Sequence, residues 1–231
     1  MIFFNSKDEF QKKKWDLLHK KDYHPSVKES VKRITDHKNQ NIWLFDEWSK
    51  ILEIDINVEN KTILEIGFGG GWYLAQMLFR NASKVIGFEI TEEIINKAKE
   101  VFQSLNLKNY EFFEVHEEFL NILDKNSVDI IFENTVFQHI SEEITKNYLL
   151  SSKNVLKNDG IILCQFLMND DDTIKTPYTK NKEGIVYYSH KEILKLVDEC
   201  NLRIEKYGDF EWKDERNSYW RLYIIKNILV N

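Results

Sequence analysis

The feature that most constrains the fold is a glycine-rich turn that directly follows a short apolar segment. Residues 62–66 have the pattern of a β-strand, and Gly67, Gly69 and Gly71 come immediately after it. Glycines at the carboxyl end of a strand let the backbone turn sharply and approach a ligand without a clash from Cβ. In an open parallel sheet, ligands bind at this edge. The sequence therefore predicts an α/β fold with a ligand site at residues 67–71.

The residues around this turn distinguish between classes of nucleotide ligand. A phosphate-binding NTPase loop needs Gly-Lys-Ser or Gly-Lys-Thr after its glycines, and this chain has Trp72 there instead. A dinucleotide fingerprint that starts at Gly67 needs its third glycine at position 72, where close packing of helix on strand excludes a side chain. Glu65, at the mouth of the turn, would repel a pyrophosphate and attract an ammonium group. We therefore expect a nucleoside ligand that carries positive charge.

After residue 60, strand-like and helix-like segments alternate, which is typical of a parallel sheet with crossover helices. The expected strands cover residues 62–66, 84–89, 110–115, 128–132, 161–166, 202–207 and 219–225. The expected helices cover residues 74–79, 94–105, 141–160 and 189–200. The polar residues 168–184 are expected to form a loop. The pattern predicts a doubly wound α/β sheet.

The first part of the chain has a helical pattern instead. Apolar residues recur there at spacings of three and four, which predicts one amphipathic helix: Leu44, Phe45, Trp48, Ile51 and Leu52. A second, more highly charged helix is expected at residues 6–19. The chain is therefore expected to have an N-terminal helical cap at residues 1–58 and a Rossmann-like core at residues 59–231.

Composition narrows the classes of partner. The chain has 38 acidic and 32 basic side chains, a net charge of −6, and only 5 arginines. Such a charge matches a nucleic-acid backbone poorly, so we expect no nucleic-acid partner. No apolar run approaches the roughly 20 residues that span a bilayer. Charged side chains begin at Lys7, so we expect no signal peptide. Cys164 and Cys200 are too few for a disulfide framework, so we expect reduced cysteines in a cytoplasmic protein.

The glycine turn resembles the first motif of the class I S-adenosylmethionine-dependent methyltransferases, an acidic residue followed by Gly-x-Gly-x-Gly. Glu65, Gly67, Gly69 and Gly71 match it. The resemblance covers roughly residues 60–225 and implies S-adenosylmethionine as cofactor. It also implies seven strands in the order 3-2-1-4-5-7-6, with the last strand antiparallel. Glu89 closes the second strand, where the family uses an acid to hold both ribose hydroxyls, because a carboxylate accepts two hydrogen bonds from a vicinal diol.

The resemblance assigns further cofactor contacts after the third strand. Here the family usually has Gly-Asp-Ala, and this chain has His116, Glu117 and Glu118. Glu117 takes the acidic position that accepts from the adenine amino group, and Glu118 and Phe119 would line the adenine ring.

Residues 129–140 resemble the family's fourth motif. By that resemblance, Glu133 at the strand end approaches the methionine part of the cofactor, and Gln138 and His139 form the motif's final pair. Trp72 and Ile90, which follow the first and second strands, complete the expected cofactor contacts.

Methyl transfer needs a nucleophile with a free lone pair, and a hydroxyl acceptor needs a base. His139 is our first candidate for that base, because neutral imidazole accepts a proton near pH 7; the alternative is a helix-entry residue that bonds the backbone. His24 is a weaker candidate for a substrate role. His190 follows Ser189, an expected helix N-cap, and is expected to lie on a helix surface. Residues 170–172 are all Asp but are expected to be solvated, so no metal site is predicted.

These observations predict an S-adenosylmethionine-dependent methyltransferase, a monomer or homodimer, that acts on an oxygen or nitrogen of a small polar metabolite. A sugar, a sugar nucleotide or a cell-surface glycan precursor is one expected acceptor class, and the Lys-, Asn- and Ile-rich composition suggests a bacterial source. A non-catalytic cofactor-binding scaffold is one alternative. An aminopropyltransferase-like enzyme is another, although its acceptor site should carry paired acids where this chain has Glu133 and Asn134.

Overall fold

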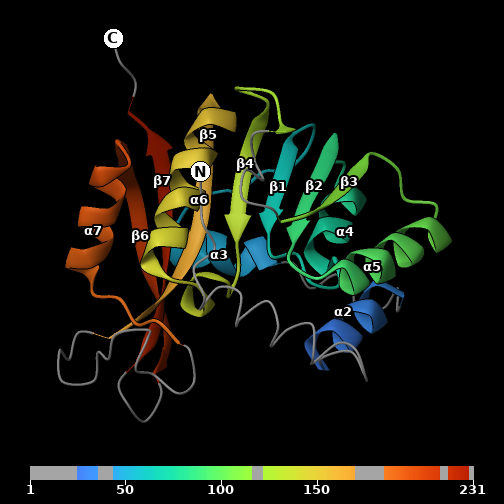
Figure 1. Ribbon diagram of the computed structural model, residues 1–231, viewed down its shortest axis with the longest axis horizontal. Coiled ribbons are helices and arrows are strands. Elements are labelled where there is room, and N and C mark those ends of the chain that lie inside the picture. Colours follow the sequence, from blue (N-terminus) through green and yellow to red (C-terminus); the bar gives the residue numbers. More distant parts are fainter. Residues whose placement is uncertain (1–24, 36–43, 116–121, 170–184, 214–217, 229–231) are drawn as a thin grey trace.

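A computed structural model describes residues 25–35, 44–115, 122–169, 185–213 and 218–228 of the chain. Its centre is one seven-stranded sheet (Figure 1). The strands are β1 (Thr62–Ile66), β2 (Lys84–Glu89), β3 (Tyr110–Glu114), β4 (Val128–Glu133), β5 (Leu156–Met168), β6 (Leu202–Lys213) and β7 (Tyr219–Asn227).

The order of strands across the sheet is β3-β2-β1-β4-β5-β7-β6. Neighbouring strands are parallel from β3 through to β5, whereas β7 is antiparallel to both β5 and β6. This is the order, with an antiparallel last strand, that the sequence motifs implied, so the fold prediction is confirmed. The carboxyl ends of the parallel strands lie at one edge of the sheet, the lower edge in Figure 1.

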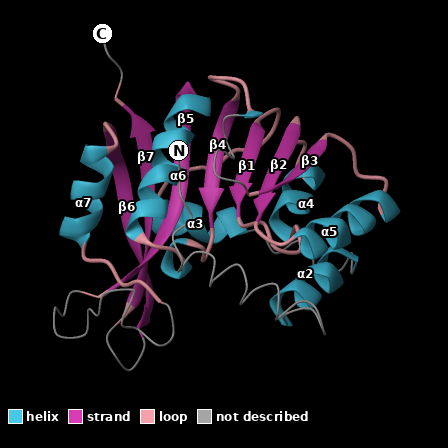
Figure 2. Cartoon of the chain, in the orientation of Figure 1, coloured by secondary structure: helices cyan, strands magenta, loops and turns pink. Residues whose placement is uncertain are grey.

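Helices cover both faces of the sheet (Figure 2). They are α2 (Pro25–Thr35), α3 (Leu44–Leu52), α4 (Trp72–Phe79), α5 (Glu92–Ser104), the 3-10 helix η3 (Phe137–His139), α6 (Glu142–Val155) and α7 (His190–Glu199). Apolar side chains from α6 and α7 form a core on one face, and those from α3, α4 and α5 form a second core on the other face. No helix in the described ranges is long and apolar enough to cross a membrane.

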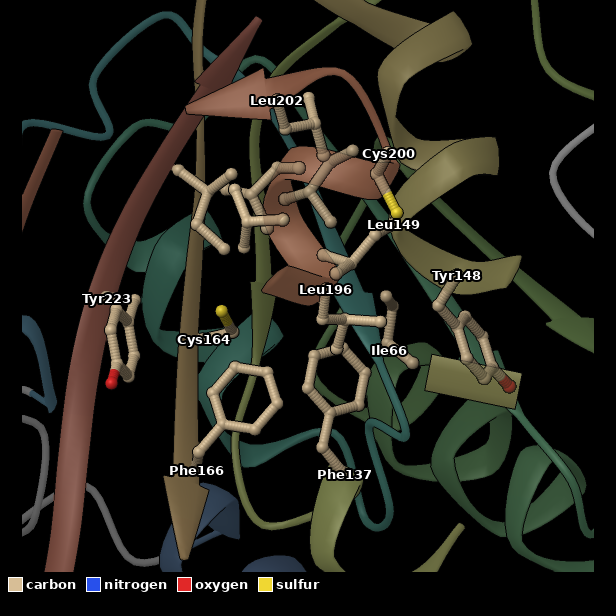
Figure 3. Close-up of a cluster of buried hydrophobic side chains, with 14 of the residues drawn as sticks. Ile66, Phe137, Tyr148, Leu149, Cys164, Phe166, Leu196, Cys200, Leu202 and Tyr223 are labelled. Atoms are coloured by element: carbon tan, nitrogen blue, oxygen red, sulfur yellow. The ribbon is translucent and has the colours of Figure 1, made fainter. Parts of the chain in front are cut away.

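The core beneath α6 and α7 contains both cysteines (Figure 3). Cys164 on β5 and Cys200 after α7 are buried and free, as expected from the sequence. Phe166 on β5 packs edge-on against Tyr223 on β7, with ring centroids 5.7 Å apart. This core therefore joins the antiparallel end of the sheet to its parallel half.

Helices α2 and α3 share the core of the other face. Phe132 of β4 makes edge-on contacts with Phe45 and Trp48 of α3, at centroid distances of 5.4 and 6.4 Å. Ile34 of α2 is fully buried in the same cluster. Apolar side chains on both sides of the boundary expected at residue 58 thus pack together, and the division into cap and core stays a prediction. The helix expected at 6–19 and His24 lie outside the described residues.

Two boundaries were predicted wrongly. The sixth strand was expected to end at residue 207, but β6 continues to Lys213. The sequence predicted that the helix after Ser141 ends near Gly160, but α6 ends at Val155 and β5 begins at the next residue. The pairing of β4 with β5 shifts between Leu156 and Ile161, so residues 157–160 form an irregular stretch of strand. A Cβ on Gly160 would lie 2.9 Å from the backbone oxygen of Asp129. Gly160 is therefore required because β4 and β5 approach each other closely at this point, and it does not end a helix.

Candidate functional site

The glycine turn lies between β1 and α4, at the carboxyl edge of the sheet. Gly67, Gly69 and Gly71 all have positive φ angles, of 71°, 51° and 79°. A Cβ on Gly67 would overlap with Cγ2 of Val136, and one on Gly71 would lie 2.9 Å from the ring of Phe102. A Cβ on Gly69 would meet nothing within 4 Å. Two of the glycines are thus required by packing, while the third faces open space where a ligand can approach the backbone.

Glu65 lies on β1, just before this turn. Its side chain is 2% exposed, and its Oε2 atom is buried with no hydrogen-bond partner among the described residues. Burial raises the pKa of this carboxyl well above its usual value, and the charges of Glu89 and Glu133 raise it further. A buried acceptor without a partner is costly, and a cation would satisfy it. The residue therefore fits the ammonium group of the cofactor that the sequence predicted.

Glu89 ends β2 and binds three backbone N–H groups. Its Oε2 accepts from Gly69 at 3.1 Å, and its Oε1 accepts from Ile90 at 2.8 Å and from Thr91 at 3.3 Å. Burial raises the pKa of this carboxyl, and the three hydrogen bonds act in the opposite direction. The three N–H groups occupy three of its roughly four lone-pair sites, so about one remains, on Oε2, to accept from the predicted ribose hydroxyls. The ribose contact and the contact from Ile90 stay predictions.

Thr91 lies two residues after Glu89 and directly precedes α5. It holds the N-cap position, but its side chain makes no capping hydrogen bond. Its Oγ1 atom is buried without a partner among the described residues. After Oε2 of Glu65, this hydroxyl oxygen is therefore a second buried polar atom near Glu89 that lacks a hydrogen-bond partner among the described residues.

Glu133 ends β4 and is fully buried, at 0% exposure. Its Oε1 accepts from the backbone N–H groups of Val136 and Phe137, and its Oε2 accepts from that of Gln165 at 3.3 Å. Burial raises the pKa of this carboxyl to about 7 in spite of these hydrogen bonds. Its predicted contact with the methionine part of the cofactor is not tested by this geometry and stays a prediction.

Gln138 and His139 belong to η3, which follows this turn. Gln138 is buried, and its backbone oxygen accepts from the N–H of Val186 at 2.8 Å. Its side-chain Oε1 is buried with no partner among the described residues. His139 is half-buried, and its backbone N–H donates to Val136 at 2.8 Å. The roles predicted for both side chains stay predictions.

The other predicted cofactor contacts are either buried in the core or outside the described residues. Trp72 is the first residue of α4 and is buried in the core shared with α3 and α5. Its contact with the cofactor stays a prediction. Glu117, Glu118 and Phe119 lie outside the described residues, as do residues 170–172. Among the residues that the structure describes, no group of three or more His, Cys, Asp or Glu side chains could hold a metal ion.

His190 begins α7 and is not simply a residue of the helix surface. Ser189 caps the helix as expected, in a capping box with Glu192. The imidazole, however, is half-buried, with Nδ1 2.9 Å from the hydroxyl of Tyr223 and its ring stacked on the tyrosine ring at 14°. The contact joins α7 to β7, and local sequence carries no signal for it.

Tyr73 is a candidate site residue that the sequence analysis missed. It is the second residue of α4 and is half-buried. Burial and the charge of Glu65 raise the pKa of its hydroxyl, and a hydrogen bond with the side chain of Asn134 lowers it. Tyr73 therefore lies between the end of β1 and the turn after β4. Its position directly after Trp72 was the only signal available from the sequence.

Comparison with known proteins shows which family this chain belongs to. Residues 57–216 match a family model described as a methyltransferase domain. The chain is 32% identical over 135 residues to tRNA (guanine-N(7)-)-methyltransferase from Thermotoga maritima, which covers 54% of this chain and 42% of the relative. It is 28% identical over 171 residues to phosphoethanolamine N-methyltransferase 1 from Triticum aestivum, which covers 72% of this chain and 32% of the relative. The chain thus spans less than half the length of either relative.

A solved structure shows the same fold. A SAM-dependent methyltransferase from Aquifex aeolicus has a TM-score of 0.59 and 22% identity, with 88% of this chain and 98% of that chain covered. At this identity the likeness concerns the fold alone. By their names, the two relatives above methylate a tRNA base and phosphoethanolamine, so similarity to them leaves the acceptor open.

Proposed function

This chain belongs to the methyltransferase domain family, as the match over residues 57–216 shows, and we propose that it methylates an oxygen or nitrogen of a small polar metabolite. Family membership confirms the resemblance carried by the sequence motifs and, with it, S-adenosylmethionine as the cofactor. The acceptor classes that we propose first are a sugar, a sugar nucleotide or a cell-surface glycan precursor. The protein would act as a monomer or homodimer.

The observation that carries this proposal is the pairing of an open glycine turn with a buried, unsatisfied carboxylate. Gly69 offers backbone that a ligand can approach, and Glu65 offers an acceptor that lacks a partner among the described residues. A ligand that combines a nucleoside with an ammonium group fits both. A pyrophosphate fits neither the charge of Glu65 nor that of Glu89.

The residues present divide the work of holding such a ligand. Glu65 would hold the ammonium group, and Glu89 would accept from the ribose hydroxyls while it keeps the glycine turn in place through Gly69. In this proposal Glu117, Glu118 and Phe119 surround the adenine. Trp72 and Ile90 would contribute apolar surface, and Gln138 a polar contact. The cofactor, when bound, supplies a methyl carbon that is activated by a positively charged sulfur.

Catalysis would then depend on alignment and on a free lone pair at the acceptor. The acceptor's lone pair forms the new bond to the methyl carbon, and the electrons of the broken carbon–sulfur bond remain on sulfur, which leaves a neutral thioether. No acid is needed for this leaving group. For a hydroxyl acceptor, His139 would take the proton, because neutral imidazole accepts protons near pH 7. Correct alignment alone can contribute about 7–11 kcal/mol to lowering the barrier.

RNA is the second candidate acceptor, because one relative is named as a tRNA methyltransferase. The charge of this chain argues against it. Proteins that bind nucleic acid neutralise phosphates with Lys and Arg, whereas this chain carries a net charge of −6 and 5 arginines. A small metabolite does not need such a surface.

A screen with a methyl-labelled cofactor tests the acceptor class. Purified protein would be incubated with fractionated metabolite pools and, separately, with total tRNA, and the label would be followed by mass spectrometry. We expect label in a low-molecular-weight polar fraction. Label in tRNA alone would replace the small-molecule proposal, and label in neither, despite cofactor binding, would favour the non-catalytic scaffold. Transfer of an aminopropyl group from the decarboxylated cofactor would favour the aminopropyltransferase-like alternative.

A further inference from the structure

Glu133 has an unusual position for a carboxylate at the end of a strand. It is fully buried, and its two oxygens accept from backbone N–H groups of two separate segments. Val136 and Phe137 belong to the turn after β4, and Gln165 belongs to β5. Buried charge of this kind persists only where hydrogen bonds replace water. The carboxylate therefore ties the turn that follows β4 to the neighbouring strand.

The turn that Glu133 holds is strained. Thr135 has a φ angle of 67°, in the left-handed region that β-branched residues rarely adopt. Such a conformation persists only where the surroundings enforce it. The two hydrogen bonds from Val136 and Phe137 to Glu133 close this turn directly after Thr135, so they supply that enforcement.

The strained turn also forms one wall of the glycine turn. The Cγ2 methyl of Val136 occupies the place where a Cβ on Gly67 would stand. The same turn leads directly into η3, which carries Gln138 and His139. A shift of the turn would therefore displace both the wall of the cofactor site and the proposed base.

We propose that Glu133 is a positioning residue, which acts on the cofactor site through the turn at residues 134–137 and not by touching the cofactor. This inference rests on the proposed function. It differs from the contact with the methionine part that the sequence motif implies, and the two roles respond differently to a second substitution.

The test uses the binding of S-adenosylhomocysteine, measured by calorimetry well below the unfolding temperature of each variant. In Glu133→Gln the amide oxygen can still accept from Val136 and Phe137, but the amide NH2 then faces the N–H of Gln165, donor against donor. We expect affinity to fall at least fivefold. In the double variant with Thr135→Gly, glycine adopts the positive φ angle at position 135 without strain, so the turn no longer depends on the hydrogen bonds of residue 133. We expect the affinity of this double variant to return to within about twofold of the wild type.

Asp129→Asn is the matched control. Asp129 lies at the other end of β4, and its carboxylate also accepts from a backbone N–H, that of Thr62 at 2.8 Å. We expect its substitution to lower the unfolding temperature and leave affinity unchanged. Should Glu133→Gln fail to fold, Val136→Ala replaces it, because it removes the wall beside Gly67 and keeps the hydrogen bonds of Glu133. Val136→Ala should also weaken binding.

The outcomes separate the two claims. Unchanged affinity in Glu133→Gln or, in its place, Val136→Ala overturns the positioning role and leaves the proposed function intact. A loss that Thr135→Gly does not restore also overturns it, in favour of direct contact with the cofactor. A wild-type protein that binds no S-adenosylhomocysteine overturns the proposed function, and the positioning role with it.

Discussion

The Oε2 atom of Glu89 accepts a hydrogen bond from the backbone N–H of Gly69 at 3.1 Å. The last residue of β2 therefore holds the glycine turn that follows β1, across the carboxyl edge of the sheet. The side chain of Glu89 holds this turn and also faces the proposed ribose site. We therefore expect removal of this side chain to weaken ligand binding more than it lowers the stability of the fold.

Glu89→Ala should weaken the binding of S-adenosylhomocysteine at least tenfold, or about 1.4 kcal/mol. It removes both the predicted acceptor for the ribose hydroxyls and the anchor of Gly69. Calorimetric titration measures the change. Glu111→Gln is the control, because Glu111 on β3 is exposed and, among the described residues, forms an ion pair with Lys84 at 2.8 Å. Equal affinity in the wild type and in Glu89→Ala would contradict the ribose role.

Two glycine substitutions should separate binding from stability. Gly69→Ala places its Cβ in open space, so its stability cost should be limited to backbone strain of about 1 kcal/mol, while the methyl group occupies the predicted ligand site. Gly67→Ala adds an overlap with Val136 and should cost about 1–3 kcal/mol more. Thermal unfolding and titration of both variants check this. Weaker binding in Gly69→Ala, with an unfolding temperature lowered by only about 2–4 °C, is the expected pattern. Unchanged binding in Gly69→Ala would argue against a ligand at Gly69.

The buried carboxylates predict how stability depends on pH. Glu133 has a folded pKa of about 7, and the pKa of Glu65 is also well above the usual value of 4.5. The folded protein therefore holds protons that the unfolded chain has released, so stability should fall as the pH rises from about 4.5 through about 7. Unfolding temperatures of the cofactor-free protein at a series of pH values measure this slope. Glu65→Gln and Glu133→Gln should each make it shallower, and slopes that match the wild type would show that these groups are ionised throughout.

His139→Ala should reduce turnover much more than cofactor affinity. The imidazole is proposed to take a proton from the acceptor and not to hold the cofactor. Initial rates with the acceptor found in the labelled screen, together with calorimetry, give the two quantities separately. His190→Ala serves as a comparison, since His190 packs against Tyr223 and should affect stability instead. Full activity in His139→Ala would remove it as the base.

The sequence predicted the parts of this site that depend on local pattern. Gly67, Gly69 and Gly71 follow an apolar strand, and this spacing alone located the turn with positive φ angles. The alternation of strands and helices, with the family motifs, gave the order of the sheet. These features depend on steric rules that act within a few residues of the chain.

What the sequence could not predict depends on contacts between distant segments. The hydrogen bond from Gln165 to Glu133 joins residues on two strands, and no local pattern indicates it. The early start of β5 was missed because Gly160 resembles a helix end until its approach to Asp129 is known. The strain at Thr135 is likewise visible only in the folded turn.

The central claim is that the turn after β1 holds an adenosyl sulfonium compound and not a diphosphate coenzyme. Calorimetric titration of the wild-type protein with S-adenosylhomocysteine and, separately, with NAD tests it most directly. We expect saturable binding of S-adenosylhomocysteine that Glu65→Gln weakens at least tenfold, and no binding of NAD in the same concentration range. Binding of NAD in preference to S-adenosylhomocysteine would contradict the claim.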